Sequence, residues 1–556
     1  MNQIDTHLLI VGGGAAGLAA ACKAYEEGLD RILIVEGSNE LGGILLQCIH
    51  TGFGLEYFKE NLTGPEYMQR FLNKIGKYGI QVMTKTMALQ IDTRSRYEHV
   101  VTVSSPERGF FSINAKAVIM TTGCRERGRD ELNIPGDRPA GVMTAGTAQR
   151  YMDIYGYLPG KEVVVVGSGD IGMIMARRFS QEGANVKGVY EILPYACGLR
   201  RNQSQCLKDF GIPLHLSSTV IQINGRSRVE SVVVAKVDEA FNPIPGTEEE
   251  VKCDVLILAT GLLPDTRFPK LLPEGIGLEI DRGTGGPIVN DLLETNIPNV
   301  FAAGNFLLVN DTVDDVTIQG EVAATSAVKA LRENGPANVE WKRVIVGEGI
   351  RFVVPQMFSG NKDVCFYMRV NRPAESVFIE VPEVNKRFFN RVVRPPEMIK
   401  LVLGKEHLSS GNLSFQIRHS TKSLKVEKPV QVCEGRTYKE ITCIICPVGC
   451  QTVVEMEGDQ VKEIKGASCT RGFEFIRQEA VCPVRILFTV VPIEGSSSVK
   501  VLPVRSDKPI AKGLLDEAYR QLAFCKAKVP IQAGDVIVRD FLRQGVNIVA
   551  SRTVQS

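Results

Sequence analysis

The sequence lacks three features that would assign it to a familiar class of protein. Its formal net charge is only +2, so it has no excess of basic residues for nucleic acid or for an anionic membrane surface. It has no stretch of about 18 uncharged apolar residues, and its first predicted strand begins within a few residues of the N-terminus, so we expect neither a transmembrane helix nor a signal peptide. These absences predict a cytoplasmic protein with no segment in a membrane.

The composition indicates a globular protein with several domains. Its 556 residues exceed what one hydrophobic core supports, and 44% of them are apolar and 23% charged, as in ordinary globular proteins. Fourteen cysteines without a predicted signal peptide indicate a reducing compartment, in which thiols serve metal binding or redox chemistry rather than disulfides.

The first informative stretch runs from His7 to Glu36. A short apolar strand, Leu8–Val11, enters a G-x-G-x-x-G motif, and a helix and a second apolar strand lead to Glu36. In this dinucleotide fingerprint the first glycine allows a tight turn, the second admits a pyrophosphate, the third lets helix and strand pack, and the acid accepts a ribose hydroxyl. We call Gly12-Gly13-Gly14-Ala15-Ala16-Gly17 with Glu36 the first cradle.

A second copy of this unit follows later in the chain. Four valines, Val163–Val166, run into another G-x-G-x-x-G, and a helix and a strand lead to Glu191. We call Gly167-Ser168-Gly169-Asp170-Ile171-Gly172 with Glu191 the second cradle. Two copies predict two bound dinucleotides. Because an acid here bonds a free ribose 2′-hydroxyl and repels a 2′-phosphate, the sequence favours NAD over NADP, although Arg200 and Arg201 weaken that preference.

With these motifs the chain resembles the pyridine nucleotide–disulfide reductase superfamily of flavoproteins over about residues 5–330. The resemblance implies FAD in the first cradle and NAD(H) in the second. It also implies FAD contacts from Gly43, from Thr122-Gly123 where the chain leaves the FAD domain, and from Gly304-Asn305, whose amide replaces a carboxylate beside the ribityl chain. Gly261 lies where the chain returns from the NAD domain to the FAD domain. A helix expected from near Val316 would point its N-terminus at the flavin and stabilise its reduced, anionic form.

Within the superfamily, the chain is similar to the large subunits of heteromeric sarcosine, opine and proline dehydrogenases. It is also similar to flavoproteins encoded beside glycerol-3-phosphate dehydrogenases. The shared segments are Gly146–Gln149, Gly211–Leu214 and Gly304–Asp315. The resemblance implies that a partner subunit oxidises the carbon substrate, and that the protein is an oligomer.

The loop from Leu41 to Gly54 carries two candidate catalytic residues. In the superfamily this loop runs along the FAD and often holds a redox-active cysteine pair, but here Cys48 has no second cysteine nearby. A flavin–dithiol relay is therefore not expected. Cys48 lies either beside the flavin or in an apolar core. His50 is either a proton donor near the flavin or a structural hydrogen-bonding residue. Cys124 is expected to be a packing residue.

The predicted architecture is α/β, with two Rossmann-like domains followed by two smaller ones. The FAD-binding domain is split between residues 1–125 and 262–335, and the NAD-binding domain covers residues 126–261. Residues 338–433 alternate short apolar runs with turn signals, which predicts a small β-sandwich that acts as a spacer or docking module. Residues 434–556 predict an α+β cysteine-rich domain.

The C-terminal domain carries a pattern typical of a metal centre. Three thiols within eight residues can converge only if the loop wraps around the centre, and Pro447 and Gly449 provide the bend. The pattern is C-x2-C-x3-C-x18-C, at Cys443, Cys446, Cys450 and Cys469. Four thiolates suit structural zinc or a [4Fe–4S] cluster, and the three-cysteine loop, similar to that of molybdopterin oxidoreductases, favours the cluster. Cys482 is either an alternative ligand or a core thiol. Residues 439–556 also resemble a small four-cysteine domain of unassigned function.

Together these features predict an FAD-dependent oxidoreductase that transfers electrons between NAD(H), flavin and a [4Fe–4S] cluster. We expect it to serve as the electron-transfer partner of a glycerol-3-phosphate or amine dehydrogenase subunit. Two alternatives remain. One is a stand-alone NADH oxidase or disulfide reductase that uses Cys48. The other is a non-catalytic scaffold subunit with structural FAD and zinc. No motif specifies the carbon substrate or the direction of electron flow.

Overall fold

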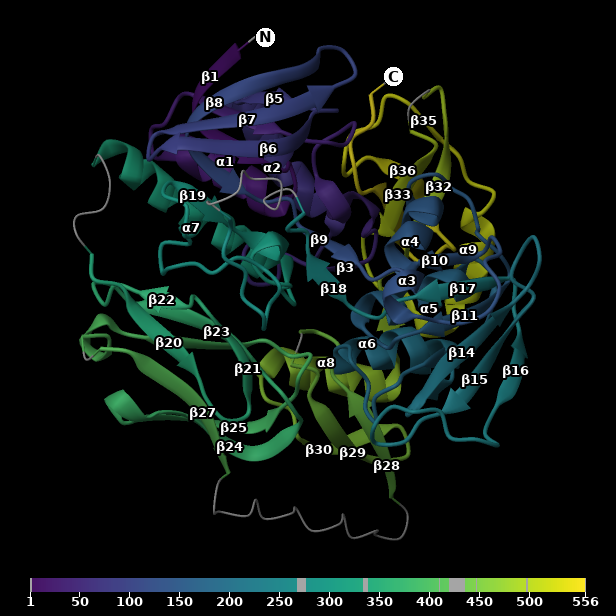
Figure 1. Ribbon diagram of the computed structural model, residues 1–556. Helices are drawn as coiled ribbons and strands as arrows, with labels where there is room; N and C mark the ends of the chain where they lie inside the picture. Colours follow the sequence, from purple (N-terminus) through teal and green to yellow (C-terminus); the bar gives the residue numbers. More distant parts are fainter. Residues whose placement is uncertain are drawn as a thin grey trace. The chain divides into compact units, whose positions relative to one another are not determined.

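The computed structural model describes residues 3–267, 277–333, 339–409, 411–419, 436–446, 448–496 and 499–555. The predicted domain boundary at residues 433 and 434 lies outside this part, as does Pro447. The chain divides into two compact units (Figure 1). Unit 1 comprises Met1–Leu45, Arg70–Arg125 and Leu262–Val426, and unit 2 comprises Leu46–Gln69, Glu126–Gly261 and Glu427–Ser556. The segment Leu46–Gln69, predicted as part of the FAD domain, therefore belongs to the same unit as the second cradle.

Unit 1 contains a seven-stranded sheet centred on β1, whose apolar run is fully buried: Leu8, Leu9 and Ile10 have no exposed surface. Burial on both faces is typical of parallel strands, and β1 pairs in parallel with β2 and β8. The order is β5-β2-β1-β8-β7-β6, with β19 beside β8. The strands are β1 (Gln3–Val11), β2 (Ile32–Val35), β5 (Gln81–Met83), β6 (Met87–Ser95), β7 (Glu98–Ser105), β8 (Gly109–Met120) and β19 (Val300–Ala302).

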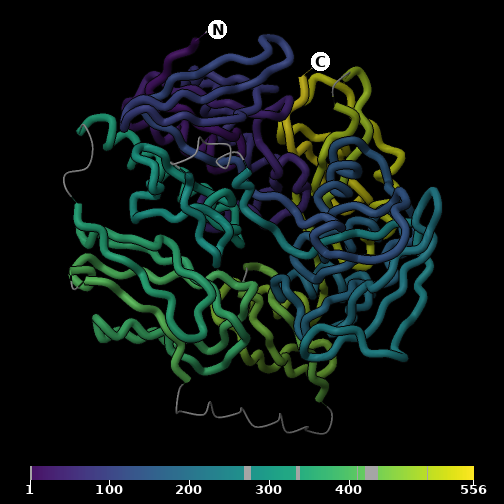
Figure 2. Tube along the Cα trace, viewed as in Figure 1, coloured from purple at the N-terminus to yellow at the C-terminus, as the bar shows by residue number. Residues whose placement is uncertain are grey.

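Two helices of unit 1 come from opposite ends of the flavoprotein region and pack closely. A Cβ atom at Gly320 of α7 (Val313–Arg332) would lie 2.3 Å from the carbonyl oxygen of Ala16 in α1 (Ala15–Glu26), so the contact requires glycine. In the Cα trace, the teal segment with β19 and α7 lies beside the purple and blue N-terminal strands (Figure 2). The helix α2 (Gly64–Tyr78) crosses the boundary between the units.

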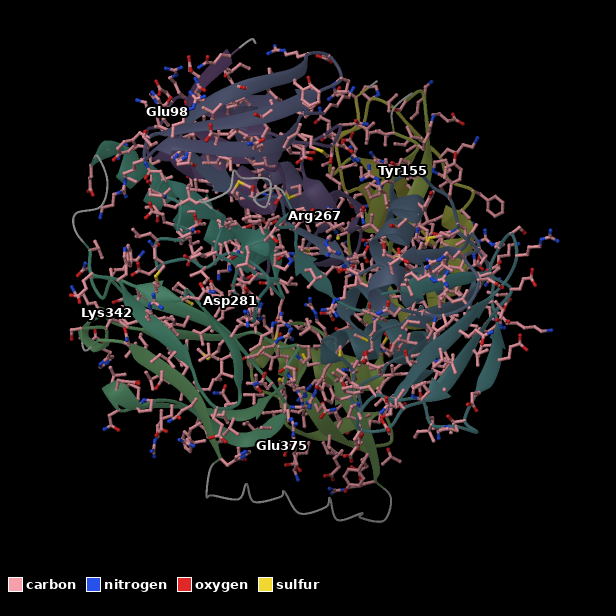
Figure 3. The ribbon with its side chains drawn as sticks, in the orientation of Figure 1. Glu98, Tyr155, Arg267, Asp281, Lys342 and Glu375 are labelled. Carbon is pink, nitrogen blue, oxygen red and sulfur yellow. The ribbon has the colours of Figure 1, made fainter. Side chains whose placement is uncertain are left out.

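The remaining part of unit 1 is a β-sandwich. Two sheets, β22-β20-β27-β24-β25 and β21-β23-β26, bury one shared core that includes Phe366 and Phe415. Lys342, labelled in Figure 3, donates from β20 to the carbonyl oxygens of Leu408 and Ser409. The strands are β20 (Lys342–Val346), β21 (Ile350–Val354), β22 (Met357–Phe358), β23 (Val364–Val370), β24 (Ala374–Val381), β25 (Lys386–Val393), β26 (Ile399–Leu403) and β27 (Leu413–His419).

Unit 2 repeats the Rossmann plan around a five-stranded parallel sheet of order β10-β17-β11-β12-β13. A small antiparallel sheet, β14-β15-β16, follows. The helices are α3 (Arg129–Leu132), α4 (Ala145–Asp153), α5 (Asp170–Gln181) and α6 (Arg200–Asn202). The strands are β10 (Val142–Thr144), β11 (Glu162–Val166), β12 (Asn185–Tyr190), β13 (Leu214–His215), β14 (Ser218–Asn224), β15 (Ser231–Lys236), β16 (Glu249–Lys252) and β17 (Val255–Leu258), with β3 (Thr51–Phe53) and β4 (Leu62–Thr63) in the segment Leu46–Gln69. The short strands β9 (Cys124–Glu126) and β18 (Leu262–Pro264) lie where the chain passes between the units.

The C-terminal part of unit 2 has two small sheets. The sheet β28-β29-β30 packs against α8, and the sheet β35-β32-β33-β37-β36 shares a core with α9. The elements are β28 (Thr437–Thr442), β29 (Gln451–Glu457), β30 (Gln460–Lys465), α8 (Thr470–Val481), β31 (Val484–Arg485), β32 (Phe488–Glu494), β33 (Val501–Ser506), β34 (Ile510–Ala511), α9 (Leu515–Leu522), β35 (Ala527–Lys528), β36 (Val536–Phe541) and β37 (Val546–Ala550). In the described part of the chain, no helix has the length and apolar character needed to span a membrane.

Candidate functional site

The first cradle joins β1 to α1 through backbone contacts that only glycine permits. Gly12 has a φ of +109°, and a Cβ there would lie 2.4 Å from the carbonyl oxygen of Thr121. A Cβ at Gly17 would lie 1.9 Å from the carbonyl oxygen of Gly12. Gly14, by contrast, has no atom within 4 Å of its Cβ position and precedes the first turn of α1. The turn is therefore tight, and the helix N-terminus remains open to an anion.

Glu36 and Gly43 complete the open side of the first cradle. The Glu36 carboxylate accepts hydrogen bonds of 2.7 Å from the backbone N–H groups of Gly13 and Ser38. The side chain stays half-exposed, so lone pairs remain for a ligand. A Cβ at Gly43 would lie 3.1 Å from the Cα of Gly14. The structure therefore brings Glu36 and Gly43 to the glycine turn, as the sequence predicts.

The other end of this site lies where two helix N-termini meet. A Cβ at Gly304 would lie 2.9 Å from Ala16 Cβ and 3.1 Å from Val316 Cγ1, in the first turns of α1 and α7. The side-chain oxygen of Asn305 accepts a bond from the N–H of Asn310, and its amide nitrogen donates to the Cys124 sulfur, 3.6 Å away. Cys124 is thus a neighbour of Asn305 rather than only a packing residue.

Thr122 and Gly123, where the chain leaves the predicted FAD domain, follow the carboxyl end of β8. The Thr122 hydroxyl donates to the carbonyl oxygen of Asp265, and Gly123 has a φ of +78°. The open glycine turn, the half-exposed acid and the two helix N-termini fit an FAD molecule. Gly12, Gly14, Ala15, Ala16, Gly17, Glu36, Gly43, Thr122, Gly123, Gly304 and Asn305 would hold it.

The β-sandwich anchors the N-terminus of α7, and this contact was not predicted from the sequence. The helix begins at Val313 rather than near Val316, because the hydroxyl of Thr312 caps it by accepting from the N–H of Asp315. Lys400 on β26 pairs with Asp315 at 2.6 Å, and Arg369 on β23 pairs with Asp311. The Asp315 side chain is only 3% exposed. The β-sandwich therefore neutralises two carboxylates at the end of α7 that faces Gly304.

The second cradle has the same backbone geometry as the first. Gly167 has a φ of +95°, and its Cβ would lie 2.3 Å from the carbonyl oxygen of Ala259. A Cβ at Gly172 would lie 2.4 Å from the carbonyl oxygen of Gly167. Gly169 precedes α5, and Gly261 has a φ of +107°. The backbone conformation of these residues fits a second dinucleotide.

The side chains of the second cradle, however, are already engaged by the chain itself. Glu191 is 4% exposed, and its carboxylate accepts from the N–H and hydroxyl of Ser168 and from the N–H of Leu193. One oxygen of Asp170 accepts from the N–H of Leu199 at 2.8 Å and from the side chain of Asn202 at 2.7 Å. Nothing in the motif predicted these bonds.

The two candidate catalytic residues of the Leu41–Gly54 loop lie in unit 2. The side chain of the neighbouring Gln47 donates to the carbonyl oxygen of Gly146 and to Gln149. Burial, with a smaller effect of Asp153, raises the pKa of the Cys48 thiol to about 12. Burial and then Arg177 lower the pKa of His50 to about 3. Near neutral pH Cys48 is a thiol and His50 an uncharged imidazole, and neither form suits a nucleophile or an acid. Their catalytic roles stay predictions.

The four C-terminal cysteines face one another in unit 2. A Cβ at Gly472, in the first turn of α8, would lie 3.5 Å from the sulfurs of both Cys443 and Cys469. Burial raises the pKa of Cys443; a hydrogen bond to the backbone of Ile445 opposes this, and the other three thiols of the set add to it. We call Cys443, Cys446, Cys450 and Cys469 the thiol cluster. As arranged, no three His, Cys, Asp or Glu side chains in the described residues could hold a metal ion.

Cys482 lies at the opposite end of α8 from Cys469. A helix of 12 residues is about 18 Å long, so Cys482 does not belong to the thiol cluster.

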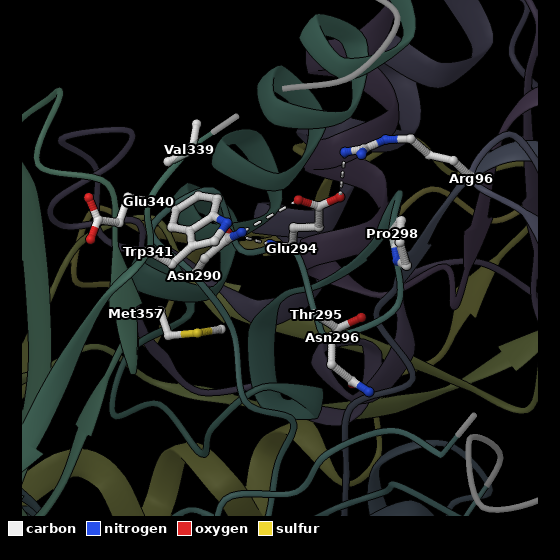
Figure 4. Close-up of a pocket in the computed structure, with 10 residues that line it drawn as sticks. All are labelled: Arg96, Asn290, Glu294, Thr295, Asn296, Pro298, Val339, Glu340, Trp341 and Met357. Atoms are coloured by element: carbon white, nitrogen blue, oxygen red, sulfur yellow. Dashed lines mark hydrogen bonds and ion pairs between the residues drawn. The ribbon is translucent and has the colours of Figure 1, made fainter. Parts of the chain in front are cut away.

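Unit 1 also has a pocket of about 590 Å³ away from the first cradle (Figure 4). It lies at the start of β19, whereas Gly304 follows the end of that strand. Its polar groups largely satisfy one another: Glu294 accepts from Asn290 and pairs with Arg96 at 3.6 Å. The lining residues are Arg96, Asn290, Glu294, Thr295, Asn296, Pro298, Val339, Glu340, Trp341 and Met357.

Two glycine cradles of one geometry, each at the end of a parallel sheet, define a flavin- and nicotinamide-dependent oxidoreductase of the two-dinucleotide type. The family model for pyridine nucleotide-disulphide oxidoreductases matches residues 6–333, more than half of the chain. The chain therefore belongs to the pyridine nucleotide-disulphide oxidoreductase family, and it is an FAD-dependent NAD(P)H oxidoreductase. A second model, for a family of proteins of unknown function (DUF1667), matches residues 470–552. That match begins after Cys469, so it contains none of the thiol cluster.

Several known proteins are similar to the flavoprotein region. The hydrogen cyanide synthase subunit HcnB of Pseudomonas aeruginosa is 25% identical over 60% of this chain and 73% of its own length. The thioredoxin reductase of Treponema pallidum is 26% identical over 59% of this chain and 98% of its own. The NAD(P)H coenzyme A polysulfide/persulfide reductase of Pyrococcus horikoshii is 27% identical over 55% and 63%. Among solved structures, the thioredoxin reductase of T. acidophilum matches 58% of this chain and 98% of its own, with 23% identity and a TM-score of 0.47.

Proposed function

We propose that this protein transfers electrons between NADH, a bound FAD and a redox centre held by the thiol cluster, as the electron-transfer subunit of a larger dehydrogenase. The observation that carries the proposal is the pair of matched cradles in one chain that also gathers four thiols. A flavin supplies the conversion between two-electron hydride transfer and single-electron transfer. The preference for NADH over NADPH rests on Glu191, whose carboxylate would repel a 2′-phosphate.

The chain's own residues have defined tasks in this proposal. The N-terminus of α1 binds the FAD pyrophosphate, and Glu36 accepts hydrogen bonds from a ribose. The N-terminus of α7 stabilises negative charge on the reduced cofactor. Arg369 and Lys400 assist α7, because they neutralise the carboxylates of Asp311 and Asp315 beside it.

The metal part of the proposal rests on donor chemistry. Four thiolates in a three-cysteine loop plus one distant cysteine suit a [4Fe–4S] cluster better than zinc. The described thiols are close together but do not form a metal-binding group as arranged. All described cysteines are free thiols, which supports the proposed cytoplasmic location.

The partner is the least defined part of the proposal. HcnB is by name a subunit of an enzyme, which supports a multisubunit assembly for this chain too. We propose a substrate-oxidising dehydrogenase subunit, for glycerol 3-phosphate or an amine, as that partner. Co-purification of the native complex, with assay of both substrates, tests this part.

The direct experiment is an anaerobic titration of the purified protein with NADH, followed by visible absorbance and electron paramagnetic resonance. We expect the oxidised flavin band to bleach and a paramagnetic iron–sulfur signal to appear. NADPH serves as the matched control and should react more slowly. A yellow protein that no nicotinamide bleaches would contradict the proposal. If NADH bleaches the flavin but metal analysis finds zinc instead of iron, only the iron–sulfur part of the proposal is contradicted.

A disulfide or sulfur reductase is the alternative that the similar proteins suggest, since two of them carry such names. It would need a reactive thiol beside the flavin. The raised pKa of Cys48 gives no support for that role. Equal turnover of a small disulfide by wild type and by Cys48→Ser would dismiss the Cys48 mechanism.

A further inference from the structure

The second cradle is covered by the chain that follows it. Gly198 is buried against the N-terminus of α5: a Cβ on it would lie 2.9 Å from the backbone nitrogen of Asp170 and 2.8 Å from its carboxylate. This is the place where a helix N-terminus accepts a pyrophosphate. In the first cradle the following chain approaches the turn instead at Gly43, whose Cβ would lie 3.1 Å from the Cα of Gly14.

Side-chain bonds hold the cover in place. The N–H of Leu199 and the side chain of Asn202 both donate to Asp170, and the N–H of Cys197 donates to the Ser168 hydroxyl at 2.8 Å. Glu191 accepts from Leu193, at the other end of the same segment. A bound dinucleotide would compete with the chain for Ser168, Asp170 and the end of α5.

The cover continues into the thiol cluster. Residues Arg200–Asn202 form α6, and a π-helical turn, Gln203–Leu207, follows; such turns are frequent at functional sites. The three-cysteine loop rests on α6: a Cβ at Gly449 would lie 2.9 Å from Arg200 Cβ and 3.3 Å from the nitrogen of Arg201. Arg201 is also deeply placed, with its Nε buried and without a hydrogen-bond partner.

We propose that residues Leu193–Leu199 occupy the second cradle in the resting protein, that a pyridine nucleotide displaces them to bind, and that α6 transmits this displacement to the thiol cluster. The inference rests on the proposed role of the second cradle as the NADH site. It adds that nucleotide binding and the state of the cysteine loop are linked, and thermodynamic linkage makes that coupling reciprocal.

The consequence for affinity follows from population shift. If the covered form dominates, the apparent affinity for NADH is reduced by the fraction of open molecules, and loosening the cover restores it. Gly198→Ala introduces a Cβ that collides with Asp170, and Asn202→Ala removes a donor from the same carboxylate. Gly128→Ala is the matched control in unit 2, because no atom lies within 4 Å of its Cβ position and its φ is not positive.

The experiment measures NADH binding to the FAD-loaded protein by calorimetry. We expect Gly198→Ala and Asn202→Ala to bind NADH about tenfold more tightly than wild type and Gly128→Ala, with unchanged flavin content. Equal or weaker binding by both folded variants overturns the cover while leaving NADH as the substrate. No NADH binding by any of the four proteins overturns the proposed function and the cover together.

Two measurements on the unmodified protein keep the inference open to test even if the variants do not fold. Hydrogen exchange at the amides of Cys197 and Leu199 should become faster when NADH is added, since both lose their side-chain acceptors. Exchange at the amide of Gly449, which donates to the carbonyl oxygen of Cys446 in the three-cysteine loop, should change severalfold under the same conditions. Unchanged exchange at Cys197 and Leu199 overturns the displacement, and unchanged exchange at Gly449 overturns the link to the thiol cluster.

Discussion

The two cradles have the same backbone geometry and differ in the side chains and the chain segment beside it. In both, the first glycine has a positive φ and lies against a carbonyl oxygen of the neighbouring strand, and the third lies against the carbonyl of the first. In both, the terminal acid accepts from the N–H after the first glycine. Both carboxylates accept hydrogen bonds on both oxygens, yet Glu36 is half-exposed, whereas Glu191 is buried and also accepts from the Ser168 hydroxyl.

This difference shows that a fingerprint specifies a turn and not an accessible site. The glycines are required by close backbone packing, which persists whether or not a ligand binds. The next segment of the chain differs between the two cradles. After β2 it passes the Cα of Gly14 at Gly43, whereas after β12 it passes the backbone nitrogen of Asp170 at Gly198 and bonds the Asp170 carboxylate through Leu199 and Asn202. In our proposal, only the second cradle has to open before a dinucleotide binds.

The largest effect that tests this comparison should come from the third glycine of each cradle. Gly17→Ala forces a Cβ within 1.9 Å of a carbonyl oxygen, and Gly172→Ala within 2.4 Å of another. We expect Gly17→Ala to lose its FAD and unfold at lower temperature, and Gly172→Ala to keep its FAD and lose bleaching by NADH. Visible absorbance before and after NADH separates the two results.

Gly76→Ala is the control for these substitutions, since it lies within α2 and no atom lies within 4 Å of its Cβ position. It should be neutral or slightly stabilising. If Gly172→Ala also lost its FAD, the two cradles would not be independent, and the comparison between them would fail.

The second test concerns the thiol cluster beside the second cradle. If a metal centre is present, iodoacetamide should label the exposed Cys482 at once and spare Cys443, Cys446, Cys450 and Cys469. After anaerobic removal of the metal with a chelator, the exposed Cys469 should become labelled as well. Peptide mass spectrometry with iron analysis gives both readings. Equal labelling before and after chelation would show that the thiols hold no metal.

The sequence predicted the parts of the site that depend on short spacings. Gly12 to Glu36 and Gly167 to Glu191 are each one βαβ unit, so their contacts follow from local rules. The segment Leu193–Leu199 could not be predicted as a cover, because it carries no motif and Gly198 is one glycine among many. The bonds from Asp170 to Leu199 and Asn202 depend on where the chain turns after β12.

Contacts between distant segments also escaped prediction. The assignment of Leu46–Gln69 to unit 2 rests on pairs such as Glu66 with Arg505, which are far apart in sequence and belong to no pattern. The same holds for Lys400 and Asp315 in unit 1. The β-sandwich was predicted from its alternation of apolar residues, but its role in anchoring α7 needed the three-dimensional contacts.

A third test removes that anchor from the first cradle. Lys400→Met leaves the buried Asp315 carboxylate without its cation, which we expect to cost up to about 3 kcal/mol, because Lys400 itself is one-third exposed. The melting temperature and the flavin reduction potential should both fall. Lys329→Met, on an exposed and long ion pair of the same helix, is the control and should change stability by less than about 0.5 kcal/mol. Equal effects of the two variants would show that the β-sandwich contact does not matter.

The smallest effect concerns His50, in the segment that unit 2 takes from the predicted FAD domain. Its pKa falls from 6.5 to about 3 on folding, so the unfolded chain binds the extra proton between these values. The neutral, buried His50 therefore does not reduce the free energy of unfolding above pH 6.5, and it reduces that free energy increasingly as the pH falls toward 3. Between pH 6.5 and 5.5 the loss should approach, at most, about 1 kcal/mol. In His50→Asn the unfolding free energy, measured by denaturant titration, should vary less across this range. An unchanged slope would mean that water reaches His50, which would restore it as a candidate proton donor.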